Sequence, residues 1–166
     1  MPDRHAPEQI QRTWGIFQQT YLLTFRYYEA VTAKFGLSYP QSAVLTVLRL
    51  NGKPLPLSRV ARLLTQEAQS TTELADRLER RGYVRRIRDQ RDRRLVLLEL
   101  TDEGQEAIDK ILPALREAGS ELFSVLDPNQ ITQLTELLLT MRNNAAERLA
   151  VDIERLQTAI EAASQV

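Results

Sequence analysis

Arginine side chains gather in one short stretch of the sequence. Between Asp76 and Arg94 the chain carries nine arginines against four acidic residues, a local net charge of +5. The rest of the chain has a net charge of −5, so the 166 residues sum to zero. A guanidinium is planar, always charged and holds its donors in a fixed fork, which suits phosphate oxygens and the O6 and N7 atoms of guanine. The distribution of charge, more than its sum, therefore predicts an anionic partner.

The residue types that most often carry catalysis and bind metals are almost missing. The sequence has no Cys and a single His, His5. We therefore expect no disulfide, thiolate metal site, catalytic triad or thiol-oxidation sensor. No Gly-rich phosphate loop is present and the carboxylates are scattered, so the sequence predicts no enzyme, no metal and no cofactor.

The composition is that of a helical globular protein. Apolar residues make up 43% of the chain and charged residues 27%. No run approaches the roughly 18 apolar residues that a membrane span needs, and the first residues lack the apolar core of a signal peptide. We expect one domain over residues 1–166, in the cytoplasm and without a membrane partner.

Two short amphipathic helices place part of the arginine-rich stretch on one face. Apolar residues at helical spacing predict a helix over about 57–64, and a second over about 69–81 that stops at Gly82. A four-residue turn joins them, which is typical of a helix-turn-helix. One face of the second helix is formed by Thr71, Leu74, Ala75 and Leu78, and the opposite face by Gln69, Thr72, Glu73, Asp76, Arg77 and Arg80.

After Gly82 the hydropathy period changes from 3.6 residues to 2. Two β-rich runs, 83–88 and 95–100, flank the polar segment 89–94. This pattern predicts a β-hairpin, or wing, that follows the helix-turn-helix. Its tip carries Arg91, Arg93 and Arg94 together with two aspartates.

Long helices are expected on both sides of this lobe. Residues 8–35 are expected to form a helix with an aromatic stripe. Thr101 is a good N-cap for a second long helix that ends at about residue 126, and Asp127-Pro128 begins the last helix. The stripe comprises Trp14, Phe17, Tyr21, Phe25 and Tyr28, and the last helix has an apolar face of Ile131, Leu134, Leu138, Met141 and Ala145, continued by a seam from Leu149 to Ala163. A lone lobe cannot bury these faces, so we expect a homodimer. The predicted fold is mainly α with a small β-hairpin: a winged helix-turn-helix lobe (about 38–101) flanked by dimerisation helices (about 8–35 and 102–163).

Four short motifs, taken in their order and spacing, resemble those of a known family. They are Val60-Ala61-x-x-Leu64, Asp76-Arg77-Leu78-Glu79-x-x-Gly82-Tyr83-Val84-x-Arg86, Asp92-Arg93-Arg94 and Leu100-Thr101-x-x-Gly104. Together they resemble the MarR (multiple-antibiotic-resistance regulator) family of bacterial transcription factors. The chain departs from that family at Glu73, where members often have Arg or Lys, and in the length of the seam after Leu149.

The resemblance implies a transcriptional regulator that binds double-stranded DNA. On the recognition helix the implied contacts are Gln69, Ser70, Thr72, Glu73, Asp76, Arg77 and Arg80, and on the wing they are Arg91, Asp92, Arg93 and Arg94. In the family a wing arginine enters the minor groove and an aspartate orients it; the matching residues are Arg94 and Asp92. A narrow minor groove has an enhanced negative potential that favours a guanidinium.

The resemblance also implies a repressor that binds a pseudo-palindromic operator as a homodimer and is released by a small aromatic or acidic effector. Candidate effector contacts are Tyr21, Phe25, Arg26, Tyr28 and Arg49. Two alternatives stay open: a DNA-binding regulator that needs no ligand, and a winged-helix module that binds protein. Salt dependence separates the last from a DNA-binding protein, because phosphate contacts weaken steeply with salt.

Overall fold

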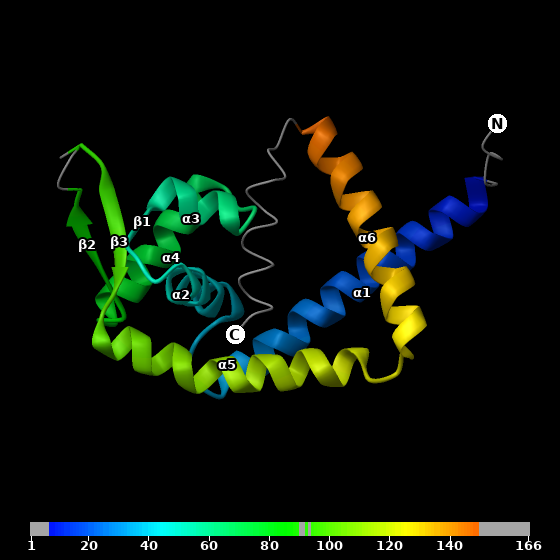
Figure 1. The fold of residues 1–166 in the computed structure, drawn as a ribbon, viewed down its shortest axis with the longest axis horizontal. Coiled ribbons are helices and arrows are strands. Elements are labelled where there is room, and N and C mark those ends of the chain that lie inside the picture. The colour runs from blue at the N-terminus through cyan, green and yellow to red at the C-terminus, as the bar shows by residue number, and fades with distance from the viewer. Residues whose placement is uncertain (1–6, 90–91, 93, 150–166) are drawn as a thin grey trace.

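Six helices and three short strands make up the described part of the chain. The structure is a computed structural model and describes residues 7–89, 92 and 94–149 (Figure 1). In chain order the elements are α1 (Pro7–Ala33), α2 (Tyr39–Asn51), β1 (Leu55–Pro56), α3 (Leu57–Leu63), α4 (Ala68–Arg80), β2 (Val84–Arg88), β3 (Val96–Leu100), α5 (Asp102–Phe123) and α6 (Pro128–Arg148). The helix-turn-helix and the wing lie where the sequence predicts them, within a residue or two at each end.

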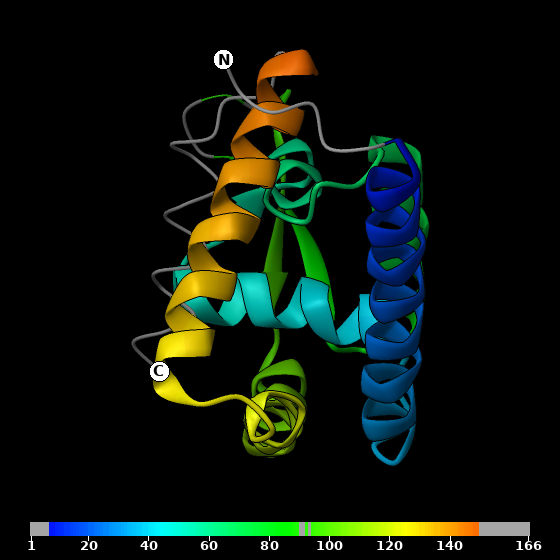
Figure 2. The ribbon, with the colours of Figure 1, turned by 90° about the vertical axis from the view of Figure 1, so that its right-hand side faces the viewer.

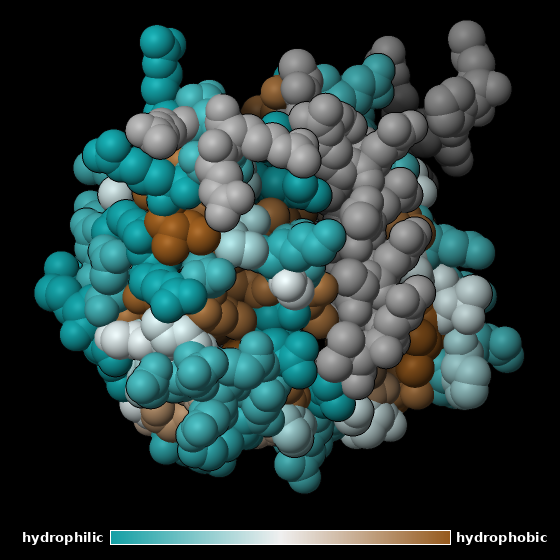
Figure 3. Space-filling model, turned by 60° about the vertical axis from the view of Figure 1, so that its left-hand side comes forward, coloured by the Kyte–Doolittle hydropathy of each residue, from teal (hydrophilic) through white to brown (hydrophobic). Residues whose placement is uncertain are grey.

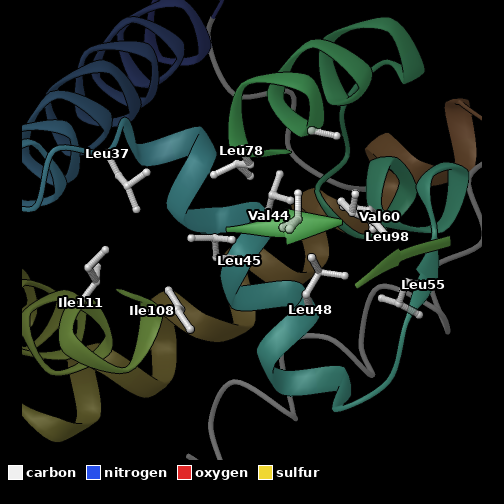
Figure 4. Close-up of a cluster of buried hydrophobic side chains, with 12 residues drawn as sticks. Leu37, Val44, Leu45, Leu48, Leu55, Val60, Leu78, Leu98, Ile108 and Ile111 are labelled. Carbon is white, nitrogen blue, oxygen red and sulfur yellow. The ribbon is translucent and has the colours of Figure 1, made fainter. Parts of the chain in front are cut away.

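Helix α2 forms the centre of the hydrophobic core. Its Val44, Leu45 and Leu48 are buried among apolar side chains from the surrounding elements (Figure 4). The other members of this cluster are Leu37, Leu55, Val60, Ala75, Leu78, Val84, Leu98, Ile108 and Ile111. Because α3, α4, the sheet and α5 all contribute to one core, a shift of any of them disturbs close packing that tolerates few voids. The lobe that carries α4 and the wing is therefore held as one body on α5.

The sheet has one strand more than the predicted hairpin. Its order is β1-β3-β2, with both neighbouring pairs antiparallel. Leu55 of β1 pairs with Leu98 of β3, and Val84 of β2 pairs with Leu100. Strand β1 is only two residues long, and a segment of that length shows no hydropathy period from which a strand could be predicted. It connects the loop after α2 to the wing.

The junction between the wing and α5 explains the motif Leu100-Thr101-x-x-Gly104. Thr101 Oγ1 accepts from the N–H of Gly104 at 3.0 Å and donates to the carbonyl oxygen of Gly82 at 2.6 Å. Gly82 itself has φ +76°, in the left-handed region that glycine adopts most easily. A Cβ on Gly104 would lie 1.9 Å from the carbonyl oxygen of Tyr83. The glycine thus lets the first turn of α5 lie directly against the start of the wing.

Helices α1 and α6 extend away from the lobe (Figure 1), and Figure 2 shows them on opposite sides of the view. Tyr27 of α1 donates a hydrogen bond to Glu121 of α5, and this bond is the main reason that the pKa of Tyr27 is raised. Large apolar side chains on both outer helices are exposed, among them Trp14, Leu22 and Leu23 on α1 and Leu137, Leu138 and Met141 on α6. The predicted seam beyond Leu149 lies outside the described residues. No helix in the described ranges combines the length and apolar character needed to span a bilayer.

Candidate nucleic-acid interface

Helix α4 turns its polar side away from the core. Thr71, Ala75 and Leu78 are buried. The opposite side is formed by five exposed residues, which we call the outward face of α4: Gln69, Ser70, Glu73, Arg77 and Arg80. Thr72 and Asp76 are partly buried along its border. The structure therefore brings all seven residues predicted on this helix to one side of it, as its buried triplet requires.

Arg86 joins α4 to the wing. Its Nη2 lies 2.5 Å from Asp76 Oδ1, and its Nη1 contacts Glu79 Oε2. The other carboxylate oxygen of Glu79 accepts from the backbone N–H of Arg86 at 3.0 Å. Partial burial acts to lower the pKa of Arg86, but its bonds to Asp76 and Glu79 outweigh that and raise it. We call these three residues the Arg86 clamp.

The Arg86 clamp changes the interpretation of Asp76. The sequence placed Asp76 among the DNA contacts because it lies on the polar side of the helix. In the structure its carboxylate is engaged by Arg86 of β2. The contact shows that Asp76 helps to position the wing against the helix, and contact of Asp76 with DNA stays a prediction.

Two aspartates build the described part of the wing tip. Asp89 Oδ1 accepts from the N–H of Asp92 at 2.9 Å, and Asp92 Oδ1 accepts from the N–H of Arg94 at 3.0 Å. The contact between Asp92 and Arg94 is therefore made to the backbone, and it fixes the turn from which the Arg94 side chain projects. Orientation of the guanidinium by Asp92 stays a prediction. Arg91 and Arg93 lie outside the described residues.

A second arginine connects the end of α4 to the end of α1. Arg81 Nη1 donates to the carbonyl oxygen of Gly36 at 2.5 Å, and its guanidinium carbon lies 4.9 Å from the centre of the Tyr83 ring. Gly36 belongs to the turn between α1 and α2. This hydrogen bond links the turn after α1 to the carboxyl end of α4.

Four of the aromatic residues near the start of α2 lie close together. The rings of Tyr28 and Tyr39 stack with their centres 5.0 Å apart, and the ring of Phe25 meets Tyr39 edge-on at 5.7 Å. Burial raises the pKa of both tyrosines. Tyr27 is the fourth member, edge-on to Tyr28. We call this group the aromatic cluster; Tyr39 belongs to it although the sequence analysis did not select it.

Not all of the remaining candidate effector residues lie near the aromatic cluster. Arg26 and Tyr21 are exposed on the same helix, α1. Arg49 lies in the last turn of α2, about 15 Å from Tyr39 along the helix axis at 1.5 Å per residue. There Arg49 Nε binds Asp109 Oδ1 at 2.8 Å. A hydrogen bond from Gln105, and then Arg49, lower the pKa of Asp109. The structure therefore does not bring Arg49 together with the aromatic residues.

Three further basic side chains that the sequence analysis did not select are exposed on α3 and β2, the elements next to α4. Arg59 and Arg62 are exposed on α3, and Arg88 is exposed at the end of β2. The side of the molecule that carries the sheet is largely hydrophilic, with smaller apolar patches between (Figure 3). Within the described ranges, no group of three or more His, Cys, Asp or Glu side chains is placed to hold a metal ion. The arrangement suits contact with a polyanion along α4 and β2.

A helix-turn-helix followed by a basic wing on a shared core defines a winged-helix DNA-binding protein. Residues 26–111 match the family model of the transcriptional regulators SarA/Rot. The chain is 32% identical to the HTH-type transcriptional regulator YkoM of Bacillus subtilis, over 79% of this chain and 84% of YkoM. It is 31% identical to PecS of Dickeya dadantii, over 75% of this chain and 76% of PecS.

Structural comparison agrees with the sequence matches. AbsC of Streptomyces coelicolor, a MarR family regulator, has the same fold, with a TM-score of 0.80 at 23% identity over 87% of this chain and 99% of AbsC. The chain belongs to the SarA/Rot family of transcriptional regulators, which bind DNA, and it shares its winged-helix fold with the MarR family regulator AbsC. Its relatives are named as regulators, a class without enzymatic activity.

The Arg86 clamp yields a test of what holds the wing in place. Arg86→Ala leaves the carboxylates of Asp76 and Glu79 without a guanidinium partner beside the outward face of α4. We expect it to lower the free energy of unfolding by about 1 kcal/mol, since solvent reaches both carboxylates, and to weaken DNA binding about tenfold or more. Urea unfolding and fluorescence anisotropy with duplex DNA measure the two effects.

Arg85→Ala is the matched control, because it removes a guanidinium from the same strand. Arg85 is mostly exposed and makes one ion pair, with Glu99. Exposed pairs contribute about 0–1 kcal/mol. Equal losses of stability and of DNA affinity in the two variants would show that Arg86 has no special role.

Proposed function

We propose that the protein is a homodimeric repressor that binds a pseudo-palindromic operator in the cytoplasm and releases it when a small aromatic or acidic effector binds. The observation that carries this proposal is the common orientation of the outward face of α4 and the wing, fixed by the Arg86 clamp. A helix that enters the major groove and a wing that reaches the neighbouring minor groove must be held in one orientation. The structure of Staphylococcus aureus MepR with DNA, which shares this fold (TM-score 0.72, 20% identity, 78% of this chain and 95% of MepR), supports the proposal.

The exposed apolar surface of α1 and α6 supports the dimer. Trp14 and Leu22 on α1 are 56% exposed, and Leu137 on α6 is 64% exposed. Monomeric soluble proteins rarely leave contiguous apolar surface of this kind open to water. A two-fold dimer buries the same face of both copies and presents two α4 helices to two half-sites of a palindrome.

Light scattering at micromolar concentration is expected to give twice the mass of the chain. Leu138→Asp on α6 should shift the protein toward the monomer, because it puts a charge into the buried interface. Val96→Asp is the control: it changes an exposed apolar residue of the wing in the same way and should leave the mass unchanged. A monomeric wild-type protein would contradict the dimer.

Effector release is supported by the aromatic cluster and by Arg26, an exposed residue that follows Phe25 on α1. Aromatic rings suit a planar ligand, and a guanidinium suits a carboxylate. Two proteins with this fold are described with aromatic ligands. Bordetella bronchiseptica BpsR is regulated by 6-hydroxynicotinic acid (TM-score 0.71, 21% identity, 79% of this chain, 98% of BpsR), and the organohalide sensor RdhR was solved with 2,4-dichlorophenol (TM-score 0.74, 18% identity, 87% and 86%). A ligand shifts the regulator only if it prefers the DNA-incompetent state.

Arg94→Ala tests the wing. We expect it to weaken binding to an operator selected from random DNA by about 1–3 kcal/mol and to lower the salt slope by about one, with the base preference unchanged. Arg116→Ala, which removes an exposed charge from α5, is the control and should change neither quantity. If Arg94→Ala binds as tightly as the wild type at moderate salt, the wing does not contact DNA and the protein-binding alternative is favoured.

Benzoate and 6-hydroxynicotinic acid test the effector. Each is expected to raise the melting temperature and to weaken operator binding, and Arg26→Gln should lose the response because the carboxylate loses its partner. Arg12→Gln removes an exposed charge near the other end of α1 and should respond as the wild type does. A panel of aromatic acids that changes neither quantity would favour the ligand-independent regulator.

A further inference from the structure

Glu73 occupies the middle of the outward face of α4. Residues of a helix turn by about 100° each, so Glu73 projects almost directly away from the buried Thr71, Ala75 and Leu78. Gln69 lies about one turn before it and Arg80 two turns after it. Whatever lies in front of this helix therefore meets a carboxylate at its centre.

A carboxylate in that position opposes binding to DNA unless a base donates to it. Phosphates repel it, and removing it from water without a partner is unfavourable. In the major groove the donors are the N4 amine of cytosine and the N6 amine of adenine. Adenine also presents its N7 acceptor next to the amine, which repels a carboxylate, whereas cytosine presents no acceptor of its own. Cytosine is therefore the base that Glu73 fits.

Arg77 lies one turn after Glu73 and supplies the complementary group. Both residues line a shallow pocket of about 300 Å³, together with Gln66, Glu67, Ser70 and Leu74. Residues at this spacing often pair with each other, yet among the described residues neither Glu73 nor Arg77 forms an ion pair. An acceptor and a fork of donors are thus both available at the same place on the helix.

The same pocket contains a further acceptor. Gln66 Oε1 is buried and has no hydrogen-bond partner among the described residues. The carboxylates of Glu67 and Glu73 and the guanidinium of Arg77 line the same pocket, so acceptors and donors are both present there. A C·G base pair presents the matching set in the major groove, the N4 donor of cytosine beside the O6 and N7 acceptors of guanine.

We propose that Glu73 and Arg77 together recognise one C·G base pair in each half of the operator, with Glu73 accepting from cytosine N4 and Arg77 donating to guanine. The proposal rests on DNA binding by α4 in the major groove and on the two half-sites of the proposed dimer. Glu73 then determines specificity: it disfavours operators without cytosine at that position and does not raise the affinity for DNA in general.

Selection of bound duplexes from a random pool tests this proposal with the full chain. The wild type is expected to enrich one C·G pair in each half-site, and its replacement by A·T should weaken binding roughly 5- to 150-fold, the range for a good side-chain contact to a base. Glutamine favours adenine through N6 and N7. In the Glu73→Gln pool we therefore expect adenine to replace cytosine at that position.

Glu106→Gln is the control, because Glu106 is an exposed carboxylate on α5 and its loss changes the net charge equally. Its pool should match that of the wild type. If Glu73→Gln enriches the same site as the wild type, the assignment of Glu73 is overturned while operator binding stands. If the wild type enriches no sequence, operator binding itself fails, and this proposal fails with it.

Discussion

The ion pairs of Arg86 with Asp76 and Glu79 are the interactions on which the DNA-binding geometry depends. Core packing, which includes Val84 and Leu98 of the wing, holds α4 and the sheet on one body, but apolar contacts are not directional. The guanidinium of Arg86 adds a directional contact, because it is planar and binds two carboxylates one turn apart on α4. A helix and a wing that enter neighbouring grooves of a rigid duplex must keep a constant separation. Because the Arg86 clamp forms within the protein itself, that separation is set before DNA binds.

The contacts within the protein divide the arginines of the basic stretch into two groups. Arg81, Arg85 and Arg86 bind protein groups in the structure, whereas Arg77, Arg80, Arg88 and Arg94 are exposed and form no ion pair among the described residues. Asp76 and Glu79 share the single guanidinium of Arg86, so these three residues together carry a net charge of −1. The positive charge that faces solvent along α4 and the wing is carried by the exposed arginines. A chain of zero net charge is compatible with a polyanionic partner for this reason.

The sequence predicted the elements of the fold better than the contacts between them. Amphipathic periods located α3 and α4, and the change of period after Gly82 located the wing, because both signals are local. Pairing of Leu55 with Leu98 joins residues far apart in the chain, and β1 is too short to show a period. Arg86 is one arginine among nine in its stretch, and only the fold shows that it faces Asp76. The family resemblance gave Arg49 and Tyr28 as contacts of one effector, but the rise of α2 keeps Arg49 away from the aromatic cluster, and Arg49 pairs with Asp109 instead.

Helix α2 connects the parts of the molecule that a regulator must couple. Its first turn contacts the aromatic cluster through Tyr39, its middle forms the core under α4, and its last turn binds α5 through Arg49 and Asp109. The first turn is also fixed by Glu29 of α1, which accepts from the N–H of Tyr39 at 2.7 Å. A ligand that separates α1 from the start of α2 therefore acts on the element that supports α4. In the proposed dimer, two α4 helices must lie about 34 Å apart to enter successive major grooves. The proposed effector would change that spacing if it displaced the first turn of α2, because α2 packs closely in the core under α4.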